Sequence, residues 1–158
     1  MATDEATRLA GEAAVARTVE ALKARNMDAM VAHSHQEALD KLKELVPQGS
    51  EVFAVTSETL DSIGFTQLVN DGKAYRSVGT LIQAAKTPEE RSDLQRTIGT
   101  SPEYVVGSVQ AVAETGEVVV ASASGSQLGS YVFGAKHVVW VVGTQKIVPT
   151  LEKAMART

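Results

Sequence analysis

The sequence contains no cysteine, and this absence excludes several kinds of chemistry at once. Without a thiol the chain forms no disulfide, no thiolate-bound zinc site and no cysteine-ligated iron–sulfur cluster. The sequence also lacks the G-x-G-x-x-G dinucleotide fingerprint and the phosphate-binding P-loop motif. No cofactor is therefore predicted, and electrons in any redox reaction would need a separate subunit.

A clustered positive charge and a long apolar run are missing as well. The net charge is −4 and the isoelectric point is about 5.4, which disfavours nucleic acid and anionic membrane surfaces as partners. No stretch reaches the roughly 18 apolar residues that a membrane-spanning helix needs. The N-terminal stretch is acidic and amphipathic, unlike a secretory signal, so we expect a cytoplasmic protein.

The 158 residues that are present fit one ordinary globular domain. The composition is 44% hydrophobic and 22% charged, close to the average for such domains. The N-terminal segment 1–25 has apolar residues at three- and four-residue spacings. This pattern predicts one amphipathic helix that covers about residues 4–25. We expect residues 26–158 to form the α/β core of the same single domain.

Short apolar runs alternate with helical patterns along this core. Capping boxes beginning at Ser34 and at Thr87 predict two helices, the second with Pro88 at its first position. Expected strands lie at 27–32, 51–55, 73–78, 104–113, 117–122 and 137–142, and further helices at 57–72, 124–133 and 148–156. Most of the strands are continuously apolar, as buried strands are. The alternation predicts a three-layer α/β domain with a mainly parallel sheet, to which 111–121 adds an antiparallel hairpin.

Candidate functional residues follow the predicted strands, because ligands bind beyond the carboxyl ends of parallel strands. Hydroxyls and small residues at predicted helix starts suggest an anion site made of free N–H groups and the positive ends of helix dipoles. Lys146 would add a positive charge. The candidate ligand-binding residues are Thr56, Ser57, Ser122, Ser124, Gly125, Ser126, Gln127 and Lys146.

Each candidate has a simpler explanation. Ser and Thr are the usual helix N-cap residues, so the hydroxyls can be plain caps. Glu114 is a candidate general base or nucleophile, or alternatively a solvated turn residue in a hairpin where Gly116 takes positive φ. His33 and His35 have no further His or Cys nearby, so no metal site is predicted.

Three segments resemble the LUD domain family, the lactate-utilisation domain. SETLDSIGF at 57–65 is similar to the family's Ser-x-Thr-Leu-x-x-Ile-Gly segment, and AVAETGEVVVASASG at 111–125 to its Ala-Glu-Thr-Gly loop and the small-residue loop that follows. FGAKHVVWVVGTQKIVPTLEKAM at 133–155 is similar to its closing strand, Lys-Ile-Val segment and final helix. Their order and spacing agree over about residues 15–156.

The resemblance implies a fold related to the sugar-phosphate isomerase, coenzyme A transferase and methenyltetrahydrofolate synthetase group. It also implies a setting in bacterial oxidation of lactate to pyruvate, beside iron–sulfur subunits. Where many members carry an Arg in the small-residue loop, this chain has Gln127. Its neutral amide cannot form the bidentate, charge-assisted hydrogen bonds that an Arg forms with an anion. The family's lysine is kept as Lys146.

Three functions agree with these observations. The first is a non-redox accessory subunit of lactate utilisation that binds a small carboxylate, a phosphorylated ligand or a partner subunit at the strand ends. The second is a free-standing enzyme of acyl or phosphoryl transfer, with Glu114 as base or nucleophile and Ser124, Gly125 and Ser126 around an oxyanion. The third is a non-catalytic binding or assembly module, for example a homodimer through the Ala-rich N-terminal helix. Fold alone does not choose among them.

Overall fold

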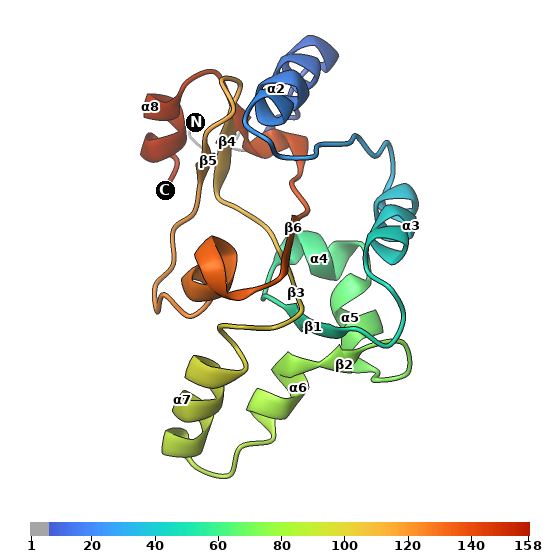
Figure 1. Ribbon diagram of the computed structural model, residues 1–158. Coiled ribbons are helices and arrows are strands. Elements are labelled where there is room, and N and C mark those ends of the chain that lie inside the picture. Colours follow the sequence, from blue (N-terminus) through green and yellow to red (C-terminus); the bar gives the residue numbers. More distant parts are fainter. Residues whose placement is uncertain (1–6) are drawn as a thin grey trace. The chain divides into compact units, whose positions relative to one another are not determined.

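The computed structural model describes residues 7–158, which divide into two compact units (Figure 1). Residues 32–108 and 122–141 form the first, called here the sheet unit. Residues 7–31, 109–121 and 142–158 form the second, called the hairpin unit. The expectation of a single domain stays a prediction.

The sheet unit is built on four parallel strands. In spatial order they are β2 (Arg76–Ser77), β1 (Glu51–Ala54), β3 (Tyr104–Gly107) and β6 (His137–Trp140). Helices come between these strands along the chain, as parallel connections require. The predicted α/β class with a mainly parallel sheet is therefore confirmed.

One face of this sheet carries the main hydrophobic core. Helices α3 (His35–Leu45), α4 (Glu58–Ser62) and α5 (Phe65–Asn70) pack their apolar side chains against alternate residues of the strands. The fully buried members include Leu60, Phe65, Val69, Val52 and Val106. Burying one such side chain contributes about 1.5–3 kcal/mol, so this layer supplies most of the unit's hydrophobic stabilisation.

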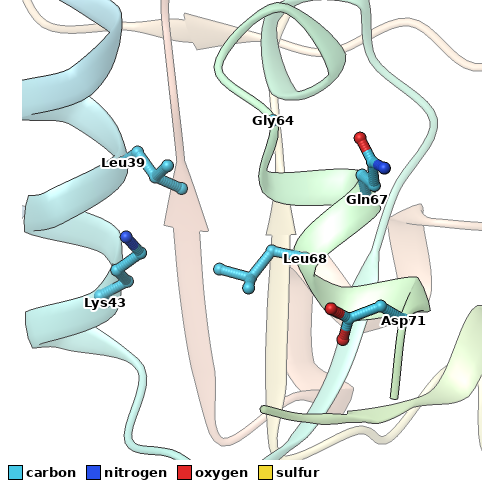
Figure 2. Close-up of a pocket in the computed structure, with 6 residues that line it drawn as sticks. All are labelled: Leu39, Lys43, Gly64, Gln67, Leu68 and Asp71. Atoms are coloured by element: carbon cyan, nitrogen blue, oxygen red, sulfur yellow. The ribbon is translucent and has the colours of Figure 1, made fainter. Parts of the chain in front are cut away.

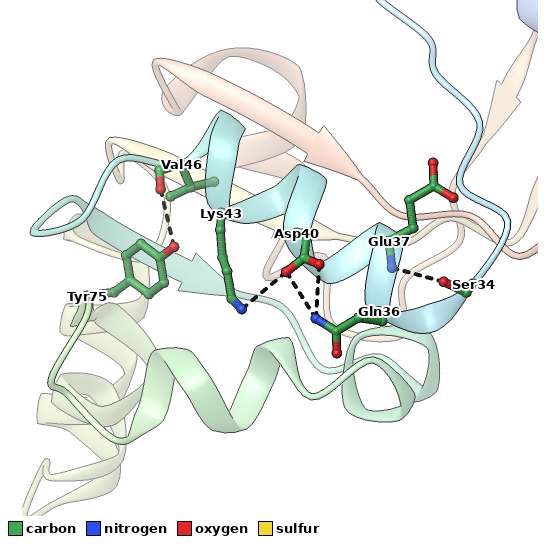
Figure 3. A network of polar contacts seen from close by, with 7 residues as sticks. All are labelled: Ser34, Gln36, Glu37, Asp40, Lys43, Val46 and Tyr75. Carbon is green, nitrogen blue, oxygen red and sulfur yellow. Dashed lines mark hydrogen bonds and ion pairs between the residues drawn. The ribbon is translucent and has the colours of Figure 1, made fainter.

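The start of α3 shows the predicted capping box, and Figure 3 shows the part of it formed by Ser34 and Glu37. The hydroxyl of Ser34 accepts a hydrogen bond from the backbone N–H of Glu37 at 3.1 Å, and the Glu37 carboxylate accepts from the N–H of His33 at 2.8 Å. The bond from the His33 amide holds the pKa of Glu37 below its ordinary value. Along the helix, the Gln36 amide donates to Asp40 at 3.0 Å.

Shorter helices belong to the rest of the sheet unit. α6 (Val78–Gln83) packs against β1 and is capped by the hydroxyl of Ser77. α7 (Pro88–Thr97) packs against α6, and its predicted box is present: Glu90 donates its N–H to Thr87 at 3.1 Å. A π-helix, η1 (Ser130–Gly134), precedes β6.

The hairpin unit contains a smaller sheet in the order β5 (Val118–Val119), β4 (Ala111–Ala113), β7 (Ile147–Val148). β4 and β5 are antiparallel, which confirms the predicted hairpin, and β7 runs parallel to β4. Helices α2 (Glu12–Ala24) and α8 (Leu151–Ala156) and the short 3-10 helix η2 (Thr144–Lys146) complete the unit. Its buried residues include Ala111, Val119 and Ala154.

Two predicted strands are wrong. Residues 27–32 form no strand, because no neighbouring strand pairs with them. The run at 104–113 is interrupted at 108–110, and its two halves, β3 and β4, belong to different sheets. In the runs 73–78 and 117–122 only two residues each are strand, and Val78 instead begins α6.

Several helix boundaries also differ from expectation. Within the run expected to be helical at 4–25, helix α2 begins at Glu12, because Gly11 takes an extended conformation at its N-cap and glycine disfavours a helix interior; residues 4–6 lie outside the described part. The expected helix at 57–72 is two helices separated by Gly64, whose φ is +77°. The expected helix at 124–133 begins only at residue 128 and continues as η1.

The strand at 137–142 is not the buried strand that its apolar run suggested. β6 is the last strand of its sheet, and His137 and Val138 are exposed. An apolar run is typical of burial on both faces, and periodicity alone cannot distinguish a central strand from an edge strand.

Candidate functional site

The carboxyl end of β1 carries the first candidate residues. Thr56 and Ser57 come one residue after the end of this strand, and Ser57 is the N-cap residue of α4. Its side chain makes no capping hydrogen bond, unlike the caps of α3, α6 and α7. The simple explanation of Ser57 as a side-chain cap therefore does not describe its geometry, and its hydroxyl is not used by the helix.

The loop at 122–127 is held by hydrogen bonds between its own polar groups. Ser122 donates its hydroxyl to the Gln127 side-chain oxygen at 2.8 Å and accepts the N–H of Gly125 at 2.9 Å. The hydroxyls of Ser124 and Ser126 lie 3.1 Å apart, and the Ser126 hydroxyl is 3.4 Å from the Gln127 oxygen. Gly125 has φ +71° and permits the tight turn. The loop thus presents hydroxyls and an amide, with no charged side chain.

Tyr131 connects this loop to the carboxyl end of β3. Its backbone N–H donates to the carbonyl of Gln127 at 3.0 Å, one turn back along the chain. Its phenol donates to the carbonyl of Ser108, directly after β3, at 3.3 Å. The ring lies over Gly107, where a Cβ would be only 1.7 Å from the phenol oxygen. The residues of the loop are therefore tethered to the same edge of the sheet that Thr56 and Ser57 follow.

Trp140, the last residue of β6, lies beside this phenol. The rings of Trp140 and Tyr131 meet edge to face with their centroids 5.6 Å apart. Burial raises the pKa of Tyr131 to about 12, so the phenol is neutral and acts as a donor. The indole N–H of Trp140 is buried and finds no acceptor within residues 7–158. The carboxyl edge of the sheet therefore holds two aromatic donors that the sequence did not point out as site residues.

Glu114 lies in the hairpin unit, in the turn that follows β4. Both Nε and one terminal nitrogen of Arg17, from α2, approach the same Glu114 oxygen, at 2.7 and 2.6 Å. The Glu114 side chain is 18% exposed and the Arg17 side chain 60% exposed. Glu114 is thus neither fully solvated nor free, because it is part of an ion pair that joins the turn to α2.

The rest of the hairpin turn is fixed to α2 in the same way. The Nε of Arg25 donates to the carbonyl of Thr115 at 3.1 Å, and Arg25 also pairs with Glu117. Gly116 has φ +93°, as the sequence predicted, and a Cβ there would be 2.8 Å from the carbonyl oxygen of Ala21. Hydrogen bonds from the Thr115 hydroxyl and then from the backbone N–H of Glu117 hold the pKa of Glu117 below its ordinary value, and the charge of Arg25 adds a smaller effect.

Lys146 also belongs to the hairpin unit, at the end of η2. Its N–H donates to the carbonyl of Gly143 at 2.9 Å, which closes this single turn. Gln145 folds back over Gly143, where a Cβ would be 2.2 Å from the Gln145 side-chain oxygen. The Gln145 side chain therefore occupies the space that a side chain at residue 143 would need.

The predicted site residues fall into two groups. Those in the sheet unit gather at the carboxyl edge of its strands: Thr56, Ser57, Ser122, Ser124, Gly125, Ser126 and Gln127. Glu114 and Lys146 belong to the hairpin unit. The sequence did not identify Tyr131 or Arg17 as partners of these groups. A glycine at the end of a strand, such as Gly107, is compatible with a side chain packed closely against the backbone. It does not indicate which side chain that is.

A separate hollow of about 280 Å³ lies between α3 and α5 (Figure 2). Leu39 and Leu68 point into it from the two helices, with Lys43 and Asp71 at its rim. Gly64 opens one end, since no atom lies within 4 Å of where its Cβ would be. None of the predicted site residues lines this hollow.

Across residues 7–158, no three potential His, Asp or Glu ligands come together as a metal site would require. No helix in the same range combines the length and apolarity needed to cross a bilayer.

Comparison with known proteins gives one match. The model of the LUD domain family matches residues 15–158, nearly the whole chain. The search of curated proteins gave no match, and neither did the search of solved structures.

Proposed function

The chain belongs to the LUD domain family, and from this premise we propose that it is a non-redox accessory subunit of bacterial lactate utilisation. Its role is to bind a small anionic ligand, a carboxylate or a phosphorylated compound, at the carboxyl edge of the parallel sheet. Oxidation of lactate to pyruvate takes place in iron–sulfur subunits, for whose clusters this chain has no cysteine ligands.

The observation that carries the proposal is the tethering of loop 122–127 to the end of β3. Tyr131 holds the loop there by its backbone and its phenol, next to the strand end that Ser57 follows. Hydroxyls of Ser57, Ser124 and Ser126 are suitable donors for an anion's oxygens. Because the loop has no charged side chain, it favours a weakly held ligand over a tightly bound dianion.

The ion pair of Glu114 with Arg17 argues for binding and against the alternative of acyl or phosphoryl transfer. A general base must be free to accept a proton, and a nucleophile must be free to reach its substrate. One Glu114 oxygen already accepts from two Arg17 nitrogens. The carboxylate is more useful as an anchor of the turn than as a reacting group.

The test is a thermal-shift screen of the purified chain with lactate, pyruvate, phosphate, sugar phosphates, adenine nucleotides, folates and coenzyme A thioesters. A ligand at 100 times its dissociation constant stabilises by about 2.7 kcal/mol, several degrees for a domain of this size. We expect a small carboxylate or phosphate compound to give this shift.

Two variants locate the ligand. Ser124→Ala with Ser126→Ala should reduce the ligand-induced shift. Ser92→Ala changes an exposed serine of α7 and should leave it intact. A shift that all variants keep would contradict a site at loop 122–127, and no shift with any compound would contradict the small-ligand role.

A further inference from the structure

The outer edge of β6 has its backbone hydrogen-bonding groups unused by its sheet. β6 ends the strand order β2-β1-β3-β6. His137 donates its N–H to Glu103 at 3.0 Å and Val141 donates to Gly107 at 2.8 Å, both toward β3. Successive residues of a strand alternate in direction, so the N–H and C=O groups of Val138 and Trp140 point to the opposite, outer edge.

This edge lacks the side chains that usually block strand pairing. Natural edge strands carry charged side chains, proline or bulges that prevent a further strand from adding. The stretch HVVWVV at 137–142 has no Lys, Asp, Glu or Pro. Val138 is 37% exposed, and the preceding η1 exposes Val132 to 83% and Phe133 to 93%. Two large apolar side chains at such exposure, next to an open strand, indicate a protein contact.

We propose that the outer edge of β6 pairs antiparallel with the β6 edge of a second copy of this chain. The occupant is a strand, because among protein elements a strand pairs with a whole row of outward N–H and C=O groups. A second copy fits because the outward groups match themselves about a two-fold axis at Val139. In that register Val138 lies opposite Trp140 of the second copy, and each donates its N–H to the carbonyl of the other. By symmetry, Trp140 makes the same two hydrogen bonds with Val138 of the second copy.

The same register brings the two Val139 residues together as a non-hydrogen-bonded pair, since their own N–H groups point inward to β3. No like charges meet across the pairing, because the strand carries none. The strands are only four residues long, so the backbone contact is small. We therefore expect a dimer whose population rises with protein concentration.

Cysteine cross-linking tests the register directly, because the chain has no native thiol. Val139→Cys brings two sulfurs together at the axis, where cross-strand Cβ atoms lie about 4.5–5.5 Å apart. Mild oxidation should convert it to a covalent dimer. Val138→Cys is the matched control, because its neighbour in the second copy is Trp140. Equal cross-linking of both variants, or of neither, overturns the proposal.

Val138→Pro tests the edge without changing the fold. The N–H that this proline removes faces outward, so the bonds between β3 and β6 are kept, as at other edge-strand prolines. Sedimentation should show a dimer for the wild-type chain at high concentration and a monomer for the variant, with the same circular dichroism. A wild-type chain that is monomeric at every concentration, or a variant that still dimerises, overturns the pairing.

Discussion

The phenol oxygen of Tyr131 occupies the space into which any side chain at residue 107 would extend. A Cβ on Gly107 would lie 1.7 Å from that oxygen and 2.8 Å from the ring carbon that bears it. Gly107 is the buried last residue of the inner strand β3, and Tyr131 is held by its bond to Ser108. Neither group has room to move without disturbing the strand or the loop.

Gly107→Ala should therefore lower the free energy of unfolding by about 3 kcal/mol, at the upper end of the usual cost of overpacking. Chemical denaturation measures this loss. Gly79→Ala is the matched control, because a Cβ there meets only the Ser77 hydroxyl at 3.7 Å, inside α6. Alanine suits a helix better than glycine, so this variant should gain about 0.5–1 kcal/mol. Equal effects of the two variants would show that the close approach of Tyr131 is not real.

The Arg17–Glu114 ion pair should contribute measurably to the free energy of unfolding, whereas the Lys23–Glu20 pair within α2 should not. Arg17→Ala and Glu114→Gln should each cost about 0.5–1 kcal/mol, and the double variant little more, because both remove the same bond. The Lys23–Glu20 pair is 3.7 Å long with side chains 53% and 78% exposed, so Lys23→Ala should have no measurable effect. High salt should weaken the first pair. Additive losses in the double variant would refute the coupling.

Gly116 and Gly125 both have positive φ but differ in their surroundings. A Cβ at Gly116 meets the carbonyl oxygen and carbon of Ala21 at 2.8 and 2.9 Å, whereas nothing lies within 4 Å of Gly125. Gly125→Ala should cost about 1 kcal/mol from backbone strain alone. Gly116→Ala should cost more, about 2–4 kcal/mol, because α2 must also move away from the turn. Thermal unfolding of both variants checks the order, and a larger loss for Gly125→Ala would reverse it.

Tyr131 should make stability sensitive to alkaline pH. Its pKa is raised from 10.0 to about 12 by burial, so the folded chain holds this proton more strongly than the unfolded chain. The contribution is fully present below pH 10 and is lost as pH rises through 12. Denaturation at several pH values should show a steeper alkaline decline for the wild type than for Tyr131→Phe, which has no proton to lose. Identical losses of stability in the two proteins would show that Tyr131 is not the group that titrates.

The sequence predicted the parts of the fold that depend on local chemistry. The capping boxes at Ser34 and Thr87 are present because their hydrogen bonds join residues three positions apart. The turn at 114–116 is present because glycine readily takes positive φ. Strand pairing is not local, so the missing strand at 27–32 and the division of 104–113 between two sheets could not be seen in the pattern.

The candidate site shows the same division between local and distant information. Strand ends and small residues were visible in the sequence, so Ser57 and the loop at 122–127 could be proposed. Their surroundings depend on contacts between distant residues, such as that of Tyr131 with Ser108 and that of Arg17 with Glu114. In the second case the sequence offered a carboxylate beside a tight turn, and its partner lies 97 positions away.

The interleaving of the two units along the chain sets the order in which they can form during translation. The sheet unit is incomplete until the ribosome has delivered β6, since His137 pairs with Tyr104. The hairpin unit waits longer, because Val112 needs Ile147 as its neighbour. The chain before residue 137 therefore emerges with no finished unit, and its apolar strands β1 and β3 must stay unaggregated, alone or with a chaperone, until β6 arrives.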